Sequence, residues 1–277
     1  MLNNQKILFI GAGPMSEAII SGIIQSSVIP AQQIYVQNRS NTARLKELQK
    51  KYQIHVYNEK DVHLTEFNII VLAVQPKNIE EIINQLKNTI HTNQLILSII
   101  TSMNIDYFEE RLMKQPIIRV MPNTSSMVCE SATAMAVGKY TNNHHIEMSK
   151  MIFRSIGEVY TIAEKHMDIF TGIAGSGPAY FYALMEQMES VAIEGGLPKQ
   201  QARSIVAQTI LGAARMVLGN NGSPETLRKN VAAPNGPTEA GLVALESFGG
   251  LKAIKEAVKN TTKRSIEINE EIEKSYI

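Results

Sequence analysis

The sequence predicts an α/β protein with an N-terminal domain built on a parallel sheet (residues 1–163) and a C-terminal all-helical domain (residues 164–277). In the first part of the chain, short runs rich in Ile, Leu and Val alternate with helical patterns, an order typical of βαβ units with right-handed crossovers. After about residue 163 the strand-like runs stop and long helical patterns follow. A chain of 277 residues has room for two domains of ordinary size.

The strands expected in the first domain are short, apolar and bounded by turn residues: Lys6–Ile10, Ile34–Gln37, Ile69–Val74, Leu95–Ile100 and Ile117–Val120. The helices expected between them are Met15–Ser26, Thr42–Lys51 and Asn78–Leu86. Two of the strands, IIVLAV and LILSII, are almost continuously apolar. A parallel strand that helices cover on both faces has this character.

In the second domain, prolines mark four places where a helix can begin: Pro178, Pro198, Pro224 and Pro237. Between Ile205 and Val217 apolar residues recur at helical spacing, and small Ala and Gly residues fill many of the positions between them. One small helical domain can hardly bury so much apolar surface. We therefore expect this domain to pack against another copy of the chain, in a homodimer or a higher homo-oligomer.

Composition excludes several classes of partner. A net charge of +1 gives no electrostatic reason to expect nucleic acid or an anionic membrane surface. No apolar run reaches the ~20 residues of a membrane span, and the segment MLNNQKILFIGAG lacks the layout of a signal peptide. Cys129 is the single cysteine and the six histidines show no ligand spacing, so we expect neither an intrachain disulfide nor a metal site. The expected location is the cytoplasm.

The strongest single motif directly follows the first strand: Gly11-Ala12-Gly13-Pro14-Met15-Ser16. It matches the dinucleotide fingerprint G-x-G-x-x-[G/A] of Rossmann domains, with serine as a small residue in the last place. The first glycine makes the tight turn, and the second lets the backbone approach a pyrophosphate at the N-terminus of the following helix. The candidate contacts are Gly11, Gly13, Pro14, Met15 and Ser16. The alternative is a glycine turn in an unrelated α/β protein.

The end of the second strand indicates which dinucleotide is preferred. NAD sites usually place Asp or Glu here for the ribose hydroxyl, whereas an arginine accommodates the 2′-phosphate of NADP. This chain has Asn38 and Arg39 and no acid in that stretch. NADPH is therefore the expected cofactor, with NADH possible. The alternative is that Arg39 is only a solvated residue at the end of the strand.

Three further strand ends are candidates, because ligands of open α/β sheets lie at the carboxyl ends of the strands. The first is Ala73-Val74-Gln75-Pro76, the second contains Ile100 and Thr101, and the third contains Asn123. By position they should flank the ribose and the nicotinamide. The alternative is that they are simple loops.

The motifs GAGPMSEAI, AVQP, RVMPNT, IAGSGPAY and NVAAPNGPTEAGLVALE follow one another in order. Together they resemble the pyrroline-5-carboxylate reductase family over nearly the whole chain. The resemblance implies a Rossmann domain, and a helical domain that interlocks with its twin in a dimer, with active sites formed between subunits. The reaction it implies is hydride transfer from NAD(P)H to the C=N carbon of 1-pyrroline-5-carboxylate, a small-molecule substrate, which gives L-proline.

The resemblance also implies two catalytic-site residues. Thr238 matches the threonine whose hydroxyl contacts the ring nitrogen of the substrate, and Ser176 lies in the loop that supports this pocket. The N–H groups of the loop Ala233–Thr238 are expected to hold the substrate carboxylate. Taken without the family, Thr238 reads as a helix-capping threonine and Ser176 as a helix-entry turn.

The chain departs from the family pattern at several positions. Gln75 stands where a lysine is usual, and Ile100-Thr101-Ser102 replaces smaller residues beside the nicotinamide. In the substrate loop, Ala233 removes a hydroxyl and Pro237 removes a backbone N–H. Two alternatives therefore stay open: a catalytically weak paralogue that binds NADP(H) as a sensor, and a reductase of another cyclic imine.

Overall fold

The computed structural model describes residues 2–58, 60–219 and 222–275, which form two compact units. The first unit comprises Met1–Gly175 together with Thr261–Ile277, and the second comprises Ser176–Asn260. The boundary predicted from the sequence between the two domains lies between residues 163 and 164. In the structure, residues 164–175 lie with the first unit, where Met167 is buried in the core, and the end of the chain returns to that unit.

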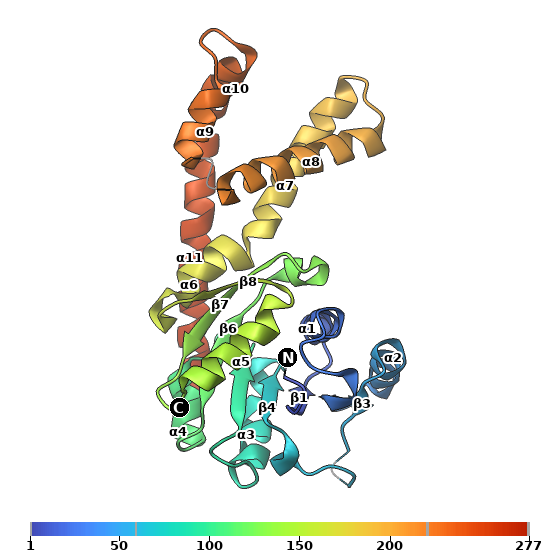
Figure 1. The fold of residues 1–277 in the computed structure, drawn as a ribbon. Coiled ribbons are helices and arrows are strands. Elements are labelled where there is room, and N and C mark those ends of the chain that lie inside the picture. Colours follow the sequence, from blue (N-terminus) through green and yellow to red (C-terminus); the bar gives the residue numbers. More distant parts are fainter. Residues whose placement is uncertain (1, 59, 220–221, 276–277) are drawn as a thin grey trace. The chain divides into compact units, whose positions relative to one another are not determined.

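The first unit is built on one eight-stranded sheet with the strand order β3-β2-β1-β4-β5-β6-β7-β8 (Figure 1). Its strands are β1 (Ile7–Ile10), β2 (Ile34–Gln37), β3 (His55–Val56), β4 (Ile69–Leu72), β5 (Leu95–Ser98), β6 (Ile117–Met121), β7 (Ser131–Val137) and β8 (Gly157–Thr161). All five predicted strands are confirmed. Three of them are shorter than predicted. β1 begins one residue later, at Ile7, and β4 and β5 end earlier because the ladder between them ends at the pair Leu72 and Ser98.

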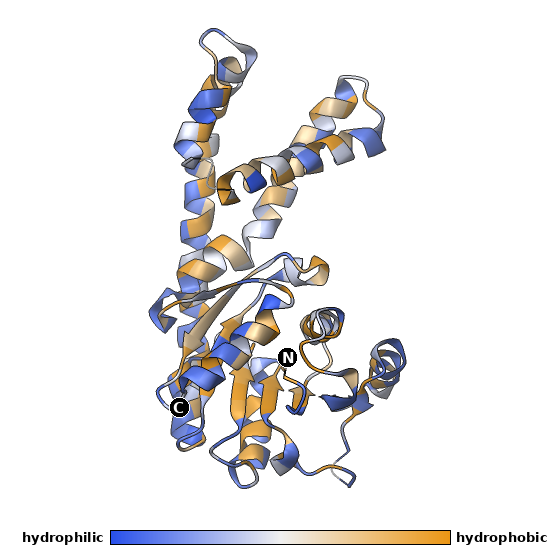
Figure 2. Ribbon diagram, viewed as in Figure 1, coloured by the Kyte–Doolittle hydropathy of each residue, from blue (hydrophilic) through white to orange (hydrophobic). Residues whose placement is uncertain are grey.

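Helices of the first unit cover both faces of this sheet. They are α1 (Pro14–Gln25), α2 (Thr42–Tyr52), α3 (Ile79–Lys87), α4 (Ile105–Arg111), α5 (Asn143–Arg154) and α6 (Met167–Phe170). Alternate residues of β1 point to opposite faces, so that Phe9 packs in the core with α1, α2 and α5 while Leu8 packs with α3 and α4. The central strands of the sheet are accordingly strongly hydrophobic (Figure 2).

The sheet is not wholly parallel as predicted, because β7 runs antiparallel to β6. A parallel connection needs a dozen or more residues, and the short loop between Met121 and Ser131 allows only a reversal of direction. After α5 the chain continues into β8, parallel to β7, at the edge of the sheet. β7 was not predicted from the sequence, because its residues, SATAMAV, are mainly small.

The last turns of the chain belong to the first unit. Helix α11 (Gly250–Ser275) is continuous, and its residues from Thr261 onwards lie in that unit. Two of its side chains, Ser265 and Asn269, each donate a hydrogen bond of 2.7 Å to Asp168 Oδ1 of α6. Ile272 packs against the core beneath α3 and α4.

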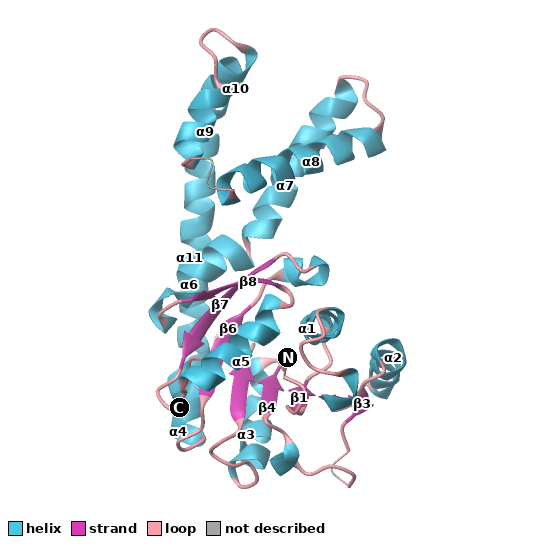
Figure 3. Cartoon of the chain, viewed as in Figure 1, coloured by secondary structure: helices cyan, strands magenta, loops and turns pink. Residues whose placement is uncertain are grey.

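The second unit is all-helical, as predicted (Figure 3). It contains α7 (Gly177–Glu194), α8 (Lys199–Leu218), α9 (Pro224–Val231), α10 (Pro237–Ser247) and the first part of α11. Each of the four prolines singled out in the sequence lies at or next to the start of a helix. Arg203 of α8 pairs with Glu189 of α7 through two hydrogen bonds of 3.0 and 3.1 Å.

A single copy of the second unit leaves much apolar surface uncovered. Only Ala202 and Val206 of the twenty residues in α8 are buried. Phe181, Val191 and Leu218 are largely exposed, and 91% of the surface of Phe248 is accessible. Apolar stripes run along these helices (Figure 2). A surface of this kind is expected to be covered by another copy of the chain.

Candidate active site

A pocket of about 370 Å³ lies at the carboxyl ends of β1, β2 and β4, entirely within the first unit. Seven of the predicted cofactor contacts line it: Gly11, Gly13, Asn38, Arg39, Ala73, Val74 and Gln75. Ile10, Ala12, Gln37, Ser40, Asn78, Glu81, Ile82 and Gln85 complete the lining. The fingerprint loop, the end of β2 and the end of β4 therefore meet where the sheet topology predicts a ligand.

Glycine is needed at the two positions of the fingerprint loop for different physical reasons. Gly11 has φ +116°, and a Cβ there would lie 2.2 Å from the carbonyl oxygen of Ala73. A Cβ at Gly13, by contrast, would meet nothing within 4 Å. Gly11 is thus required by the turn, whereas Gly13 keeps open the space that a pyrophosphate needs beside the loop.

Helix α1 begins directly behind this loop. Pro14 is its first residue, and no side chain caps its N-terminus, so the first-turn N–H groups of Met15 and Ser16 are available to an anion. The hydroxyl of Ser16, a buried residue, donates a hydrogen bond of 2.7 Å to the carbonyl oxygen of Gly11. Serine in the last place of the fingerprint thus stabilises the loop as well as fitting the space.

An acid from helix α3 approaches the arginine at the end of β2. Arg39 forms an ion pair with Glu81 of α3, at 3.8 Å between Nη1 and Oε2, and both residues line the pocket. Both side chains are mainly exposed. The side-chain oxygen Oδ1 of the neighbouring Asn38 accepts hydrogen bonds from the backbone N–H groups of Ser40 and Asn41, at 3.1 and 3.0 Å, and so shapes the turn that presents Arg39.

Helix α3 supplies the part of the pocket that sequence reasoning missed. The residues of this segment that line it follow helical spacing: Asn78, Glu81, Ile82 and Gln85. This periodicity defines one face of a helix that starts just after the predicted strand end at Gln75. The signal was present in the sequence, but only the fold shows that this face meets β2.

Seven of the fourteen predicted contacts lie outside the lining of this pocket: Pro14, Met15 and Ser16 at the start of α1, and Pro76, Ile100, Thr101 and Asn123. Pro76 begins the 3₁₀ turn Pro76–Asn78 that leads into α3. Ile100 is buried and Thr101 is exposed, just beyond the end of β5. Asn123, also buried, donates from its amide to the carbonyl oxygen of Ala174 at 2.9 Å and accepts from the N–H of Ser125 at 3.0 Å.

The bond from Asn123 to Ala174 joins two of the sequence motifs, RVMPNT and IAGSGPAY. Ala174 lies in a π-helical turn, Thr171–Gly175, and Ser176 follows at the start of α7. Single π-helical turns are rare and are frequent at functional sites. Ser176 is the N-cap residue of this helix, and its backbone carbonyl oxygen accepts the N–H of Ala179 at 3.0 Å, as in a helix-entry turn; its side chain makes no capping hydrogen bond.

Thr238 is not the capping residue of its helix. The N-cap of α10 is Gly236, Pro237 is the first helical residue, and no side chain caps this end. Thr238 is half-buried in the second position of the helix. The capping alternative drawn from the sequence is therefore wrong.

The N–H groups of the loop before α10 are less available than predicted. The N–H of Asn235 donates to the Glu239 carboxylate at 2.6 Å, and that of Gly236 donates to the carbonyl oxygen of Ala233 at 3.0 Å. The two prolines of the loop have no N–H. An anion at this end of α10 therefore has to use the N–H groups of Thr238 and Glu239.

Two further findings concern metal ligands and membrane-spanning helices. In the part of the chain that the structure describes, no group of three or more His, Cys, Asp or Glu residues is placed to hold a metal ion. Among the same residues, no helix is both long and apolar enough to span a membrane.

Comparison with known proteins identifies the family. Residues 164–268 match the family model described as pyrroline-5-carboxylate reductase dimerisation, and residues 6–102 match the model described as NADP oxidoreductase, coenzyme F420-dependent. Pyrroline-5-carboxylate reductase 1 of Bacillus subtilis is 49% identical over 276 residues, which cover 99% of this chain and 93% of the relative. The chain belongs to the pyrroline-5-carboxylate reductase family. The enzyme of that name from Arabidopsis thaliana is 31% identical over 96% of both chains.

Solved structures of pyrroline-5-carboxylate reductases have the same fold. The protein from Coxiella burnetii has a TM-score of 0.88 at 30% identity, with coverage of 96% of this chain and 99% of the other. The protein from Plasmodium falciparum, solved with NADP bound, has a TM-score of 0.84 at 28% identity, with coverage of 97% of this chain and 100% of the other. The predicted fold class, oxidoreductase class and family resemblance are thereby confirmed, and the dimerisation model confirms the expected homo-oligomer.

Proposed function

We propose that this chain reduces the C=N bond of 1-pyrroline-5-carboxylate with NADPH and so forms L-proline. The observation that carries this proposal is the pocket around the fingerprint loop, in a chain that matches reductases of this name over nearly its whole length. Of the departures from the family pattern, Gln75 lines this pocket at the end of β4, whereas Ala233 and Pro237 lie in the second unit. The proposed location of the enzyme is the cytoplasm, consistent with its single cysteine.

The first unit holds the cofactor in this proposal. The N–H groups at the start of α1 bind the pyrophosphate beside Gly13, while Arg39 binds the 2′-phosphate of the adenosine ribose. The ends of β4, β5 and β6, with Gln75, Ile100, Thr101 and Asn123, lie toward the ribose and nicotinamide. The reduced nicotinamide supplies a hydride when it is bound.

The second unit supplies the substrate side in this proposal. The Thr238 hydroxyl contacts the ring nitrogen of the imine and places the proton that this nitrogen needs. The N–H groups of Thr238 and Glu239 hold the carboxylate at the N-terminus of α10, where the helix dipole favours negative charge. Ser176, after the π-helical turn, supports the same pocket.

The proposal is tested by following NADPH oxidation by the purified protein with 1-pyrroline-5-carboxylate, beside NADH and beside a second cyclic imine. Turnover of pyrroline-5-carboxylate with the highest kcat/KM is the expected result. Faster turnover of the other imine would instead indicate a different substrate. NADPH binding without turnover of either imine would indicate a nucleotide-binding sensor.

The Arg39→Ala variant is expected to raise the KM for NADPH by roughly ten- to a hundredfold, the effect of losing a hydrogen-bonded ion pair to a phosphate. The KM for NADH should change little, because NADH has no 2′-phosphate. Steady-state kinetics with both cofactors test this. Equal changes for NADPH and NADH would contradict the role of Arg39.

The Glu81→Gln variant is expected to lower the KM for NADPH by about two- to fivefold, because the carboxylate competes with the 2′-phosphate for Arg39 and exposed ion pairs are weak. Glu80→Gln is the matched control: it removes the same charge from the same helix. Its carboxylate accepts bonds from Tyr107 (2.6 Å) and Arg111 (3.2 Å) and does not line the pocket. A similar KM in both variants would show that only net charge acts.

The protein is expected to be an obligate dimer at least, because the helices of the second unit expose apolar side chains such as Phe248 that one copy leaves uncovered. Light scattering at low micromolar concentration should detect no monomer. A stable and active monomer would contradict both the dimer and an active site shared between subunits.

A further inference from the structure

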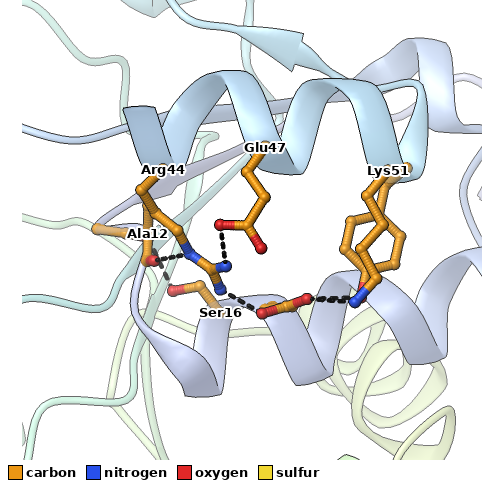
Figure 4. A network of polar contacts seen from close by, with 8 residues as sticks. Ala12, Ser16, Arg44, Glu47 and Lys51 are labelled. Atoms are coloured by element: carbon orange, nitrogen blue, oxygen red, sulfur yellow. Dashed lines mark hydrogen bonds and ion pairs between the residues drawn. The ribbon is translucent and has the colours of Figure 1, made fainter. Parts of the chain in front are cut away.

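A polar network on α1 and α2 reaches the fingerprint loop from outside the nucleotide pocket (Figure 4). Arg44 of α2 donates from Nε to the carbonyl oxygen of Ala12 at 3.3 Å. Arg44 itself does not line the pocket, whereas Ala12 and Gly13 do. Arg44 can therefore act on a bound nucleotide through the loop or through its charge, but not by lining the pocket.

The geometry of a peptide bond makes this contact informative. In a planar trans peptide the C=O and the following N–H point to opposite sides. Arg44 holds the carbonyl of Ala12 toward α2, so the N–H of Gly13 points to the other side of the loop. Ser16 does the same for the preceding peptide, because its hydroxyl holds the carbonyl of Gly11. Glycine has a permissive backbone, so the orientation of this loop depends on such external contacts.

Arg44 is itself held tightly. Its guanidinium pairs with the carboxylates of Glu17 and Glu47, the latter at 2.8 Å, and its side chain is only 20% exposed. Glu17 also accepts hydrogen bonds from Lys51 at 2.8 Å and from the Tyr52 hydroxyl at 2.9 Å. Glu17 thus fixes both Arg44 and the spacing of α1 and α2.

The carboxylate at the centre of the network, Glu17, has a lowered pKa. Burial by itself would raise the pKa of Glu17, but hydrogen bonds from Lys51, Arg44 and Tyr52 outweigh it and lower this pKa to about 2. The carboxylate of Glu17 and the guanidinium of Arg44 therefore remain paired at neutral pH.

We infer that Arg44 is a positioning residue for the nucleotide: through the Ala12 carbonyl it turns the N–H of Gly13 toward the bound pyrophosphate. The inference rests on the proposed function, in which this pocket takes NADPH. It adds a residue outside the pocket to the machinery that binds the cofactor.

The test is a fluorescence titration of NADPH into the protein without substrate, with three variants. Arg44→Gln should raise the Kd for NADPH by about tenfold, the scale of one charge-assisted hydrogen bond. Lys51→Gln is the matched control, since it removes the same charge and the same partner, Glu17, but no loop contact. Its Kd should stay within about twofold of the unchanged protein.

Glu17→Gln separates positioning from charge, because it keeps the Arg44 side chain but removes the carboxylate that holds this side chain in place. Positioning predicts a several-fold higher Kd, whereas charge alone predicts a lower Kd, since a negative charge near the pyrophosphate is removed. At saturating NADPH, kcat of all three variants should remain within about twofold of the unchanged protein, because only binding of the cofactor is affected.

Equal Kd values for Arg44→Gln and Lys51→Gln, or tighter binding by Glu17→Gln, would overturn the role of Arg44. If Arg44→Gln does not fold, Glu17→Gln and Lys51→Gln are compared. A higher Kd for NADPH in Glu17→Gln than in Lys51→Gln supports positioning, and a lower one contradicts it. Absence of NADPH binding by the unchanged protein would instead overturn the proposed function. The two failures are thus distinguishable.

Discussion

Replacing Thr238 by alanine is expected to lower kcat/KM for 1-pyrroline-5-carboxylate by ten- to a hundredfold, which corresponds to about 1.4–2.7 kcal/mol of transition-state stabilisation. The hydroxyl is proposed to contact the imine nitrogen as the hydride arrives. The melting temperature should hardly change, because Gly236 and not Thr238 is the N-cap of α10. Steady-state kinetics and thermal unfolding of the same variant provide both readouts.

Ser223 offers a matched control for this variant. It is the N-cap of α9, and its hydroxyl oxygen accepts the N–H of Thr226 at 3.1 Å. Ser223→Ala should therefore cost about 1 kcal/mol of stability and lower the melting temperature, while kcat/KM is retained. Unchanged substrate kinetics in Thr238→Ala would remove this loop from the substrate site.

Replacing Gly13 by alanine is expected to weaken NADPH binding by roughly ten- to a hundredfold, the scale of an extra methyl group forced into a filled site. The variant should fold normally. Gly13 has φ −73°, which alanine adopts without strain, and a Cβ there meets no protein atom within 4 Å. Fluorescence titration with NADPH and thermal unfolding test the two parts of this expectation.

Replacing Gly11 by alanine is the contrasting case. At φ +116° and with the Ala73 carbonyl oxygen 2.2 Å from the new Cβ, the loop has to shift. Strain of this kind costs about 1–3 kcal/mol, so the melting temperature should fall by several degrees. If Gly13→Ala bound NADPH normally, the open space beside Gly13 would not be the pyrophosphate site.

The sequence predicted those elements of the fold that bury long apolar side chains. The strands around Phe9, Val71 and Leu97 were found because their residues are fully buried on both faces of the sheet. Helices α4 and α5 and strands β3, β7 and β8 were missed. β3 has only two residues, β7 consists mainly of small residues, and β8 is an edge strand with partly exposed residues. Such elements are determined by neighbours in space and leave a weak pattern in the chain.

The candidate site likewise has one part that local motifs predict and another part that only the folded chain brings together. The fingerprint loop and Arg39 are local motifs, and Gly11, Gly13 and Arg39 line one pocket. Glu81 lies far along the chain from Arg39, so its approach depends on how α3 packs beside β2. The engagement of the Asn235 N–H by Glu239 likewise depends on backbone geometry around a left-handed residue. Motifs identify chemical groups, but hydrogen-bond partners emerge only in the folded chain.

The return of α11 to the first unit determines the order in which the protein can be completed during synthesis. The strands of the sheet are translated before α11, so Asp168 gains its partners Ser265 and Asn269 only when α11 has been made. Until then the core near α3 and α4 also lacks Ile272. A nascent chain can therefore form the sheet early, but it can close this unit only after the whole helical unit has been translated.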